Sequence, residues 1–397
     1  MIKIAILGLG TVGTGVVKVV EANTAPIRHR LGEPLCVKTA LVRTMRSGPY
    51  HHLMTANFRE IETDSEIQVV VETIGGVGAA YEYTRRCLMA GKHVVTANKQ
   101  LVAEHGCELL ELARKNHVNY LFEASVGGGI PILHPLTQCM AANRVDEIYG
   151  ILNGTTNFIL TKMVKEGASF AEVLKLAQQK GYAEADPTAD VQGIDAGRKI
   201  CILADLAFGH QVNPNRVPME GITKLDLKDV EIAGRHGYRI KLLGRCLRLE
   251  GDRRTAYVAP HLISMDNPIS DVNDVFNAVV VRGNATGEVM FYGKGAGELP
   301  TASAVVADVM ECILEDRPRP EIGWSADEGG FVSPLELKGR WYFRIDAPAE
   351  QVRPLFEKAG ILEEGRDTVL ITEPITGTEA EALAKKLPVL TCLRVLD

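Results

Sequence analysis

The sequence has little that would place the chain in a membrane, in a disulfide scaffold or on a nucleic acid. None of its apolar runs reaches the roughly 18 residues of a membrane span. Its eight cysteines include no Cys-x-x-Cys pair, so we interpret them as reduced thiols of a cytoplasmic protein. Fifty acidic residues outnumber 44 basic ones, and the net charge of −6 gives no electrostatic reason to expect nucleic-acid binding. The opening residues, MIKIAILGLG, lead directly into a strand pattern and lack the cleavage region of a signal peptide.

What the sequence does contain is a regular alternation of strands and helices. A length of 397 residues with 46% hydrophobic content is typical of a globular protein of two or three domains. Helical patterns such as 80–90 and 100–115 lie between apolar runs that read as strands. This alternation predicts a parallel sheet with helices on both faces, whose ligands bind outside the carboxyl ends of the strands. The expected strands are 2–7, 36–42, 68–73, 93–97 and 119–124.

A glycine-rich turn follows the first strand. It reads Gly8-Leu9-Gly10-Thr11-Val12-Gly13 and leads into a helical pattern, which is the GxGxxG arrangement of dinucleotide-binding domains. The first glycine permits the tight turn, the second lets the backbone approach a pyrophosphate, and the third lets the helix pack on the strand. The helix N-terminus then offers N–H groups to the phosphates. The alternative is a plain glycine turn, but the strand–turn–helix context favours a dinucleotide.

The end of the second strand bears on which dinucleotide binds. Enzymes that use NAD usually carry an acidic residue there, whereas this chain has Arg43, with Arg46 nearby. Arginine suits a 2′-phosphate, so we hypothesise that NADP(H) is preferred over NAD(H). The alternative is two solvated surface arginines.

Other side chains follow the later strands at the same expected edge of the sheet. Thr73 ends one strand, Asn98 and Lys99 follow the next, and the glycine triplet 127–129 follows the one after. The position of these residues predicts contacts with the cofactor, although Lys99 could equally be a surface lysine. We also expect Thr96 and Gly297 to contact the cofactor.

The middle of the chain carries two polar segments beside apolar ones. Asn153 and Thr155 stand between an expected strand, 147–152, and a helical pattern. Their amide and hydroxyl groups suit a polar ligand and equally suit a capped turn. Residues 181–199, GYAEADPTADVQGIDAGRK, then hold four carboxylates and a closing lysine before the apolar run 200–204.

Within this second segment, Asp195 and Lys199 are four residues apart and fall on one face of a helix. They could form a surface ion pair that stabilises the helix by a few tenths of a kcal/mol. The apolar sequence that follows favours partial burial, and a desolvated lysine has a lowered pKa and can take part in proton transfer. The pattern alone leaves both interpretations open. Asp186 precedes Pro187, which is typical of a turn residue.

The last third of the chain changes character. Residues 293–306 form a glycine-rich loop that leads into a helix ending near 314, and Pro318 and Pro320 then mark a linker. From residue 341 the pattern is strand, helix 349–358, strand, helix 379–386 and strand, which predicts a small α+β module with an antiparallel sheet.

Taken together, several stretches resemble homoserine dehydrogenases over residues 1 to about 320. The stretch 177–199, with its DPxxDxxGxD and closing lysine, is highly specific to that family. The other stretches are GLGTVG (8–13), ANK (97–99), EASVGGGIPI (123–132), AANRVDEIYGILNGTTNFIL (141–160) and GAGELPTASAVVAD (295–308).

The resemblance implies an activity and roles for the residues already singled out. The family reaction is reversible hydride transfer between NAD(P)H and the aldehyde of L-aspartate 4-semialdehyde, which gives L-homoserine on the route to threonine and methionine. Lys199 is similar to the proton donor, Asp195 to the acid that anchors it, and Lys99 to a second lysine that faces the substrate. The implied substrate-binding residues are Glu184, for the amino group, and Asp190, Tyr182, Asn153 and Thr155.

The resemblance further implies a monovalent cation, Na⁺ or K⁺, held mainly through backbone carbonyls. The matching positions are Glu123, Val126, Gly128 and Ile130. It also implies that the chain forms a homodimer or homotetramer. The binding partner that it implies is a small-molecule substrate.

The expected fold class is α/β, in three parts. A doubly wound Rossmann domain spans 1–134, an α+β substrate-binding and dimerisation domain spans 135–320, and residues 300–318 pack back on the first. Residues 331–397 resemble an ACT module. They lack the glycine that usually follows its first strand, since the chain reads Asp346-Ala347-Pro348-Ala349, and the second strand, 361–363, is short. Whether threonine regulates the chain therefore stays open.

Two other functions compete with this interpretation. Another Rossmann dehydrogenase could act on a different amino-acid semialdehyde. An amino-acid-binding regulator with a defunct dehydrogenase core is a second alternative, but the intact set of Lys99, Glu184, Asp195 and Lys199 argues against it. We expect no fused aspartate kinase, because the chain has no room for one.

Overall fold

The computed structural model describes residues 1–314, 324–356 and 358–396, so the expected linker prolines, Pro318 and Pro320, and the domain end at 320 lie outside the described residues. The chain divides into two compact units, each described by itself below. The first unit comprises Met1–Arg144, Cys201–Pro214 and Gly293–Glu328, and the second comprises Val145–Ile200, Asn215–Tyr292 and Gly329–Asp397. In the described part of the chain, no helix has the length and apolarity needed to cross a membrane.

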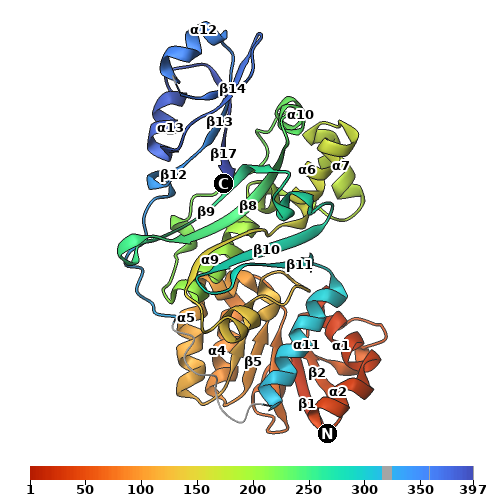
Figure 1. Cartoon of the computed structure of the whole chain (residues 1–397). Helices are drawn as coiled ribbons and strands as arrows, with labels where there is room; N and C mark the ends of the chain where they lie inside the picture. The colour runs from red at the N-terminus through yellow and green to blue at the C-terminus, as the bar shows by residue number, and fades with distance from the viewer. Residues whose placement is uncertain (315–323, 357, 397) are drawn as a thin grey trace. The chain divides into compact units, whose positions relative to one another are not determined.

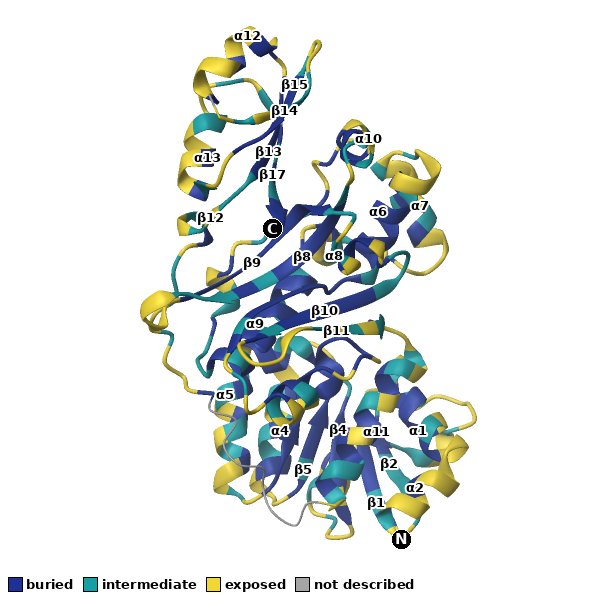
Figure 2. Cartoon of the chain, viewed as in Figure 1, coloured by how far each residue is buried: buried dark blue, intermediate teal, exposed yellow. Residues whose placement is uncertain are grey.

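The first unit is built on a six-stranded sheet in the order β3-β2-β1-β4-β5-β6, with every neighbouring pair parallel. Both faces of its central strands are buried, since Ile4 and Ile6 pack with one cluster while Ala5 and Leu7, on the other face, are also fully buried (Figure 2). The predicted parallel sheet is therefore confirmed. The strands are β1 (Ile2–Leu7), β2 (Leu35–Leu41), β3 (Met54–Thr55), β4 (Ile67–Glu72), β5 (His93–Thr96) and β6 (Tyr120–Leu121).

Helices cover this sheet. Gly15 of α1 lies directly against α11, because a Cβ at this glycine would come within 2.7 Å of the Glu298 carbonyl oxygen and 3.1 Å of Ala302 Cβ. The helix α11 thus packs on α1 in the first unit, although it lies far away in sequence (Figure 1). The helices are α1 (Thr11–Ala22), α2 (Thr24–Leu31), α3 (Arg59–Glu62), α4 (Gly78–Met89), α5 (Lys99–Lys115) and α11 (Glu298–Leu314).

The second unit is built on a nine-stranded sheet in the order β11-β10-β7-β8-β9-β17-β13-β15-β14 (Figure 1). β8 and β9 pair antiparallel along their whole length, and they are not among the strands predicted above. The strands are β7 (Val145–Ile151), β8 (Tyr238–Arg248), β9 (Arg254–Ser264), β10 (Phe276–Gly283), β11 (Gly287–Lys294), β13 (Trp341–Ile345), β14 (Gly360–Glu363), β15 (Thr368–Ile371) and β17 (Val389–Leu396). The short strands β12 (Lys338–Gly339) and β16 (Ile375–Thr376) pair separately.

The helices of this unit show where the sequence patterns mislead. The helix expected to carry Asp195 and Lys199 is preceded by a separate short helix, because Gly193 adopts a left-handed φ of +81° and turns the chain between the two. The helix expected to span 349–358 is wrong in length, since it ends at Val352 and a short 3₁₀ turn that contains Pro354, Arg353–Leu355, follows it. The helices are α6 (Gly154–Glu166), α7 (Phe170–Gln179), α8 (Thr188–Val191), α9 (Ile194–Phe208), α10 (Leu227–Arg235), α12 (Ala349–Val352) and α13 (Gly377–Ala384), and the residues of α9 from Cys201 on are counted in the first unit.

The C-terminal residues fold as strand, helix, two strands, helix and strand, and their sheet continues that of the rest of the unit. The last strand, β17, pairs in parallel with β9, with Arg394 opposite His261 and Leu396 opposite Ile263. Its other neighbour, β13, is antiparallel to it. The α+β order is the expected one, whereas the assignment to the ACT family stays a prediction.

Candidate functional site

The glycine turn after β1 has the geometry that a dinucleotide requires. Gly8 has a left-handed φ of +99°, and a Cβ there would lie 2.9 Å from the Thr73 carbonyl oxygen. A Cβ at Gly13 would lie 2.1 Å from the Gly8 carbonyl oxygen, so the helix could not pack so closely with any other residue. At Gly10, by contrast, a Cβ would meet no described atom within 4 Å. The turn is tight at Gly8 and Gly13 and open at Gly10. Thr11 and Val12 follow as the first residues of α1, whose first N–H groups have no partner within the helix. These residues fit a pyrophosphate.

The neighbouring strand ends carry the other side chains expected at the cofactor. The Thr73 hydroxyl donates to the Gly8 carbonyl oxygen at 2.7 Å, which ties the turn after β4 to the glycine turn. Thr96 is the last residue of β5 and is fully buried. Asn98 caps α5 by accepting the N–H of Leu101 at 3.2 Å, and Lys99 is the first residue of that helix.

The two arginines after β2 lie differently from each other. Both are exposed, but the Arg46 guanidinium donates to the carbonyl oxygen of Leu9, inside the glycine turn. An open hollow of about 430 Å³ lies beside Arg46. Arg46 is thus the arginine that contacts the glycine turn directly, whereas the sequence pattern put Arg43 first as the candidate for a 2′-phosphate. The hollow is lined by Met45, Arg46, Ser47, Gly48 and His51.

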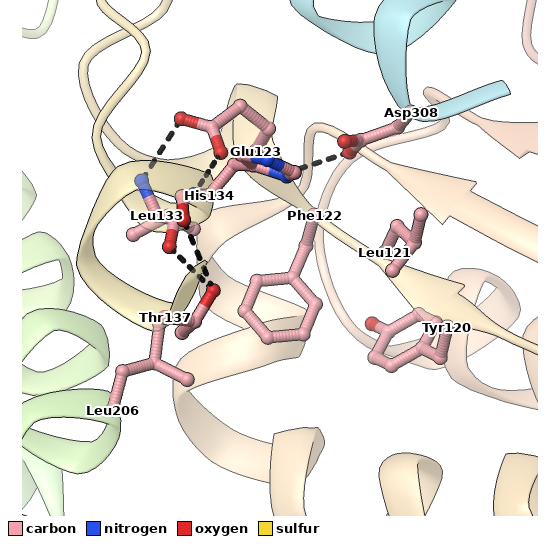
Figure 3. A pocket seen from close by; sticks show the side chains of 9 residues that line it. All are labelled: Tyr120, Leu121, Phe122, Glu123, Leu133, His134, Thr137, Leu206 and Asp308. Carbon is pink, nitrogen blue, oxygen red and sulfur yellow. Dashed lines mark hydrogen bonds between the residues drawn. The ribbon is translucent and has the colours of Figure 1, made fainter. Parts of the chain in front are cut away.

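The segment expected to hold a cation is organised by the Glu123 side chain. Its carboxylate accepts the N–H groups of Ile132 at 2.6 Å, Leu133 at 2.9 Å and His134 at 2.6 Å, and Figure 3 shows it turned toward the last two. On the other side, the Glu123 N–H donates to Asp308 of α11 at 2.8 Å (Figure 3). The carboxylate is therefore engaged with the main chain, and the Glu123 carbonyl oxygen, which is the expected ligand atom, accepts the Val126 N–H at 3.4 Å.

The glycine triplet in this segment is in close contact with the loop before α11. Gly128 has φ of +55°, and a Cβ there would lie 2.5 Å from the Gly295 carbonyl oxygen. The next residue, Gly129, donates its N–H to the Lys294 carbonyl oxygen at 3.0 Å. Gly297, with φ of +129°, ends this loop. The loop and the triplet therefore support each other, and the triplet includes Gly128, one of the expected carbonyl positions.

In the second unit, Lys199 is a buried cation held by two oxygens. Its Nζ donates to the Leu152 carbonyl oxygen at 2.6 Å and to Asp195 Oδ2 at 2.8 Å. Lys199 is only 8% exposed and Asp195 7%. The interpretation as a surface ion pair is therefore wrong, because two residues four apart on α9 are buried together. The Leu152 carbonyl could not be identified from the sequence.

Asn153 joins this pair to a second carboxylate. Its Nδ2 donates to Asp190 Oδ1 at 2.8 Å and to Asp195 Oδ2 at 3.0 Å. Its Oδ1 accepts the Thr156 N–H at 2.9 Å and so caps α6. The capped turn is therefore confirmed, whereas the binding of a polar ligand by Asn153 and Thr155 stays a prediction. All the polar atoms of this amide are used within the protein.

The loop before α8 carries the remaining residues expected to bind substrate. The Thr155 hydroxyl donates to the Tyr182 carbonyl oxygen at 2.7 Å, and the Tyr182 ring is 44% exposed and packs edge-on against Phe158. Glu184 is exposed on this loop. Asp186 accepts the hydroxyl and the N–H of Thr188, which lowers its pKa, as expected of a turn residue.

Comparisons with known proteins identify the family. A family model described as "Homoserine dehydrogenase, NAD binding domain" matches residues 8–123, and one described as "Homoserine dehydrogenase" matches residues 131–310. A homoserine dehydrogenase of Bacillus subtilis is 45% identical over 376 residues, which cover 91% of this chain and 86% of that protein. The chain belongs to the homoserine dehydrogenase family. It is an oxidoreductase with an NAD-binding Rossmann domain.

Solved structures of homoserine dehydrogenases have the same fold. A homoserine dehydrogenase from Thiobacillus denitrificans matches with a TM-score of 0.93 and 37% identity, covering all of this chain and 98% of the other. One from S. aureus, solved at pH 6.5, matches with a TM-score of 0.84 and 33% identity over 100% and 98% of the two chains. A hyperthermophilic archaeal homoserine dehydrogenase in complex with NADPH matches with a TM-score of 0.67 and 27% identity, over 81% and 99%.

Proposed function

We propose that this homoserine dehydrogenase reduces the aldehyde of L-aspartate 4-semialdehyde to L-homoserine, reversibly, with Lys199 as the proton donor. The observation that carries the proposal is the buried Lys199 ammonium between the Leu152 carbonyl and Asp195. When bound, the reduced nicotinamide supplies the hydride. An alkoxide develops on the substrate oxygen, and a desolvated ammonium stabilises such charge better than water does.

The carboxylates around Lys199 keep it charged and oriented. Asp195 accepts directly from the ammonium, so the proton that passes from Nζ to the alkoxide leaves a neutral amine still beside the carboxylate. Asp190 supports this arrangement through Asn153. In this proposal Lys99 is the second lysine at the substrate and Glu184 binds its ammonium group, with Tyr182 and Thr155 in the pocket wall.

We propose that NADP(H) is preferred over NAD(H). Arg43 and Arg46 follow β2, where a 2′-phosphate would lie, and Arg46 already contacts the glycine turn. Replacing Arg43 by Asp is expected to raise the KM for NADPH about tenfold or more and that for NADH much less, because only NADPH carries the phosphate. Arg30→Asp, which makes the same charge change on exposed α2, is the control. Equal rises for both cofactors would contradict this preference.

A monovalent cation, Na⁺ or K⁺, is proposed at the carbonyl oxygens of Glu123, Val126, Gly128 and Ile130. Within the described residues, no three His, Cys, Asp or Glu side chains gather into a metal site, and the Glu123 carboxylate is already bonded to the main chain. Carbonyl oxygens suit a hard monovalent ion. Activity measured in NaCl, KCl and choline chloride at equal ionic strength tests the proposal, and equal rates in all three would contradict it.

We also propose the three-part organisation into 1–134, 135–320 and 331–397, a homodimer or homotetramer, and an ACT-like regulatory role for the last part. Because β17 pairs with β9, deletion of the tail would remove a strand from the sheet of the second unit. Threonine titration of the full chain, with the oligomeric state measured in parallel, is therefore a better test than truncation.

The experiment that tests the proposed function follows NADPH and NADH oxidation by the purified chain, with aspartate 4-semialdehyde and with other amino-acid semialdehydes. We expect aspartate 4-semialdehyde to give the highest kcat/KM. A higher value for another semialdehyde would assign the chain to that substrate, and turnover with none would favour a regulatory protein with an inactive core.

A further inference from the structure

Glu72 is a buried carboxylate at the point where the cofactor crevice of a Rossmann sheet opens. It is the last residue of β4, opposite Leu7 of β1 and Thr96 of β5, and it is fully buried. The sheet order changes direction between β1 and β4, and ligands of such sheets bind outside the carboxyl ends of the strands at this place. A carboxylate without exposure is unfavourable unless hydrogen bonds offset its desolvation.

The Glu72 carboxylate accepts from Thr96 at the end of β5 and from two N–H groups of the turn after β4. One oxygen accepts the Thr96 hydroxyl at 2.6 Å. The other accepts the N–H of Ile74 at 2.7 Å and, more weakly, that of Gly75 at 3.4 Å. Burial raises the pKa of Glu72, and the hydrogen bonds from Thr96 and Ile74 oppose that rise. The side chain thus fastens the turn after β4 to the end of β5.

The same connection continues to the residue before Lys99. The Thr96 Oγ1 accepts the Asn98 N–H at 2.9 Å, and the Asn98 Nδ2 donates to the Gly76 carbonyl oxygen at 2.6 Å. Asn98 also caps α5, whose first residue is Lys99. The direction in which α5 begins is therefore set by a chain of short hydrogen bonds that starts at Glu72.

We propose that Glu72 is a positioning residue for the reaction, which fixes the turn 96–98 and through it the place of Lys99. The inference rests on the proposed role of Lys99 at the substrate. The alternative is a purely structural role. In that case Glu72 would stabilise the first unit and would have no particular effect on the position of Lys99.

A double-mutant cycle distinguishes the two. Glu72→Gln keeps the size of the side chain but removes the charge and one of the acceptor oxygens. We expect it to lower kcat about tenfold or more, because small displacements of a catalytic group have large effects, and to change the dissociation constant of NADPH less than about threefold. In the Lys99→Ala background the same change should lower kcat by less than about twofold, since no lysine remains to be positioned.

Two further variants keep the test interpretable. Thr96→Val removes the hydroxyl that donates to Glu72. Its effect on kcat should depend on Lys99 in the same way, and it can be measured even where Glu72→Gln yields little folded protein. Glu62→Gln is the control, since this carboxylate of the same unit pairs with Arg86 on α4, and it should leave kcat unchanged.

The outcomes separate the inference from the proposed function. If Lys99→Ala lowers kcat while Glu72→Gln and Thr96→Val do not, the role of Glu72 is overturned and that of Lys99 stands. Fully additive losses in the double variant also overturn it, in favour of a structural role. If Lys99→Ala leaves kcat unchanged, both the role of Lys99 and the inference built on it fail.

Discussion

Replacing Asn153 by Ala is the change that most broadly tests the arrangement around Lys199. The amide donates to Asp190 and to Asp195 and caps α6, so the substitution removes all three functions. Loss of a helix N-cap costs about 1 kcal/mol. Each hydrogen bond to a charged partner contributes about 1.5–3 kcal/mol, and Asp195 is buried. We therefore expect a loss in the free energy of unfolding of about 4–7 kcal/mol.

The same change should affect catalysis in a specific way. Without the amide, Asp195 loses one of the donors that fix its carboxylate beside Lys199, so we expect kcat to fall about tenfold to a hundredfold. The dissociation constant of NADPH should stay within about twofold of that of the unmodified chain, because none of the three bonds of the Asn153 amide involves the glycine turn. Urea denaturation, steady-state kinetics and a cofactor titration measure the three quantities.

Ser169→Ala is the matched control for this prediction. Ser169 caps α7 in the same unit, but it is exposed on that helix end and contacts no buried carboxylate. Its loss should cost about 1 kcal/mol and leave kcat unchanged. If Asn153→Ala behaves like Ser169→Ala in both measurements, the amide does not organise the site and the reasoning is refuted.

Two further predictions concern buried charges elsewhere in the second unit. Burial lowers the pKa of Lys241 to about 8, so between there and its ordinary value of 10.5 the unfolded chain binds more protons, and stability should rise with pH by about 3 kcal/mol. Lys241→Met should remove this rise in urea titrations, and parallel pH curves for the two proteins would contradict it. Arg344 donates to fully buried Asp229 at 2.7 and 3.0 Å, so Arg344→Met should cost about 3–5 kcal/mol, whereas loss of exposed Arg353 should cost under about 1 kcal/mol. Similar losses for both arginines would contradict the burial argument.

The parts of the fold that can be predicted from the sequence are those set by patterns within a short stretch of chain. β1 and the glycine turn are contiguous, and two of the three glycines meet a steric demand: a Cβ at Gly13 would clash with Gly8 five residues earlier, and a Cβ at Gly8 would clash with Thr73 after β4. β8 and β9 were missed because nearly every residue of β9 is buried. The alternation of polar and apolar residues that indicates a half-buried strand is therefore absent.

The site is predictable only where its residues are close in sequence. Asp195 and Lys199 are one helical turn apart, so their pairing follows from spacing, although their burial does not. The Leu152 carbonyl lies 47 residues from Lys199, and nothing in the sequence indicates that a main-chain oxygen accepts from it. Glu72 was missed for a similar reason, since its partner Thr96 lies on the next strand and only the register of the sheet brings them together.

The central claim is that Lys199 donates the proton to the substrate oxygen, and the variant Lys199→Met tests it most directly. The substitution keeps the length and the apolar stem of the side chain but removes the ammonium that contacts Asp195 and the Leu152 carbonyl. The measurement is kcat for aspartate 4-semialdehyde reduction beside the dissociation constant of NADPH. We expect kcat to fall about a hundredfold or more, which is the size of a general-acid contribution, and cofactor binding to stay unchanged. Turnover within a few-fold of the unmodified enzyme would contradict it.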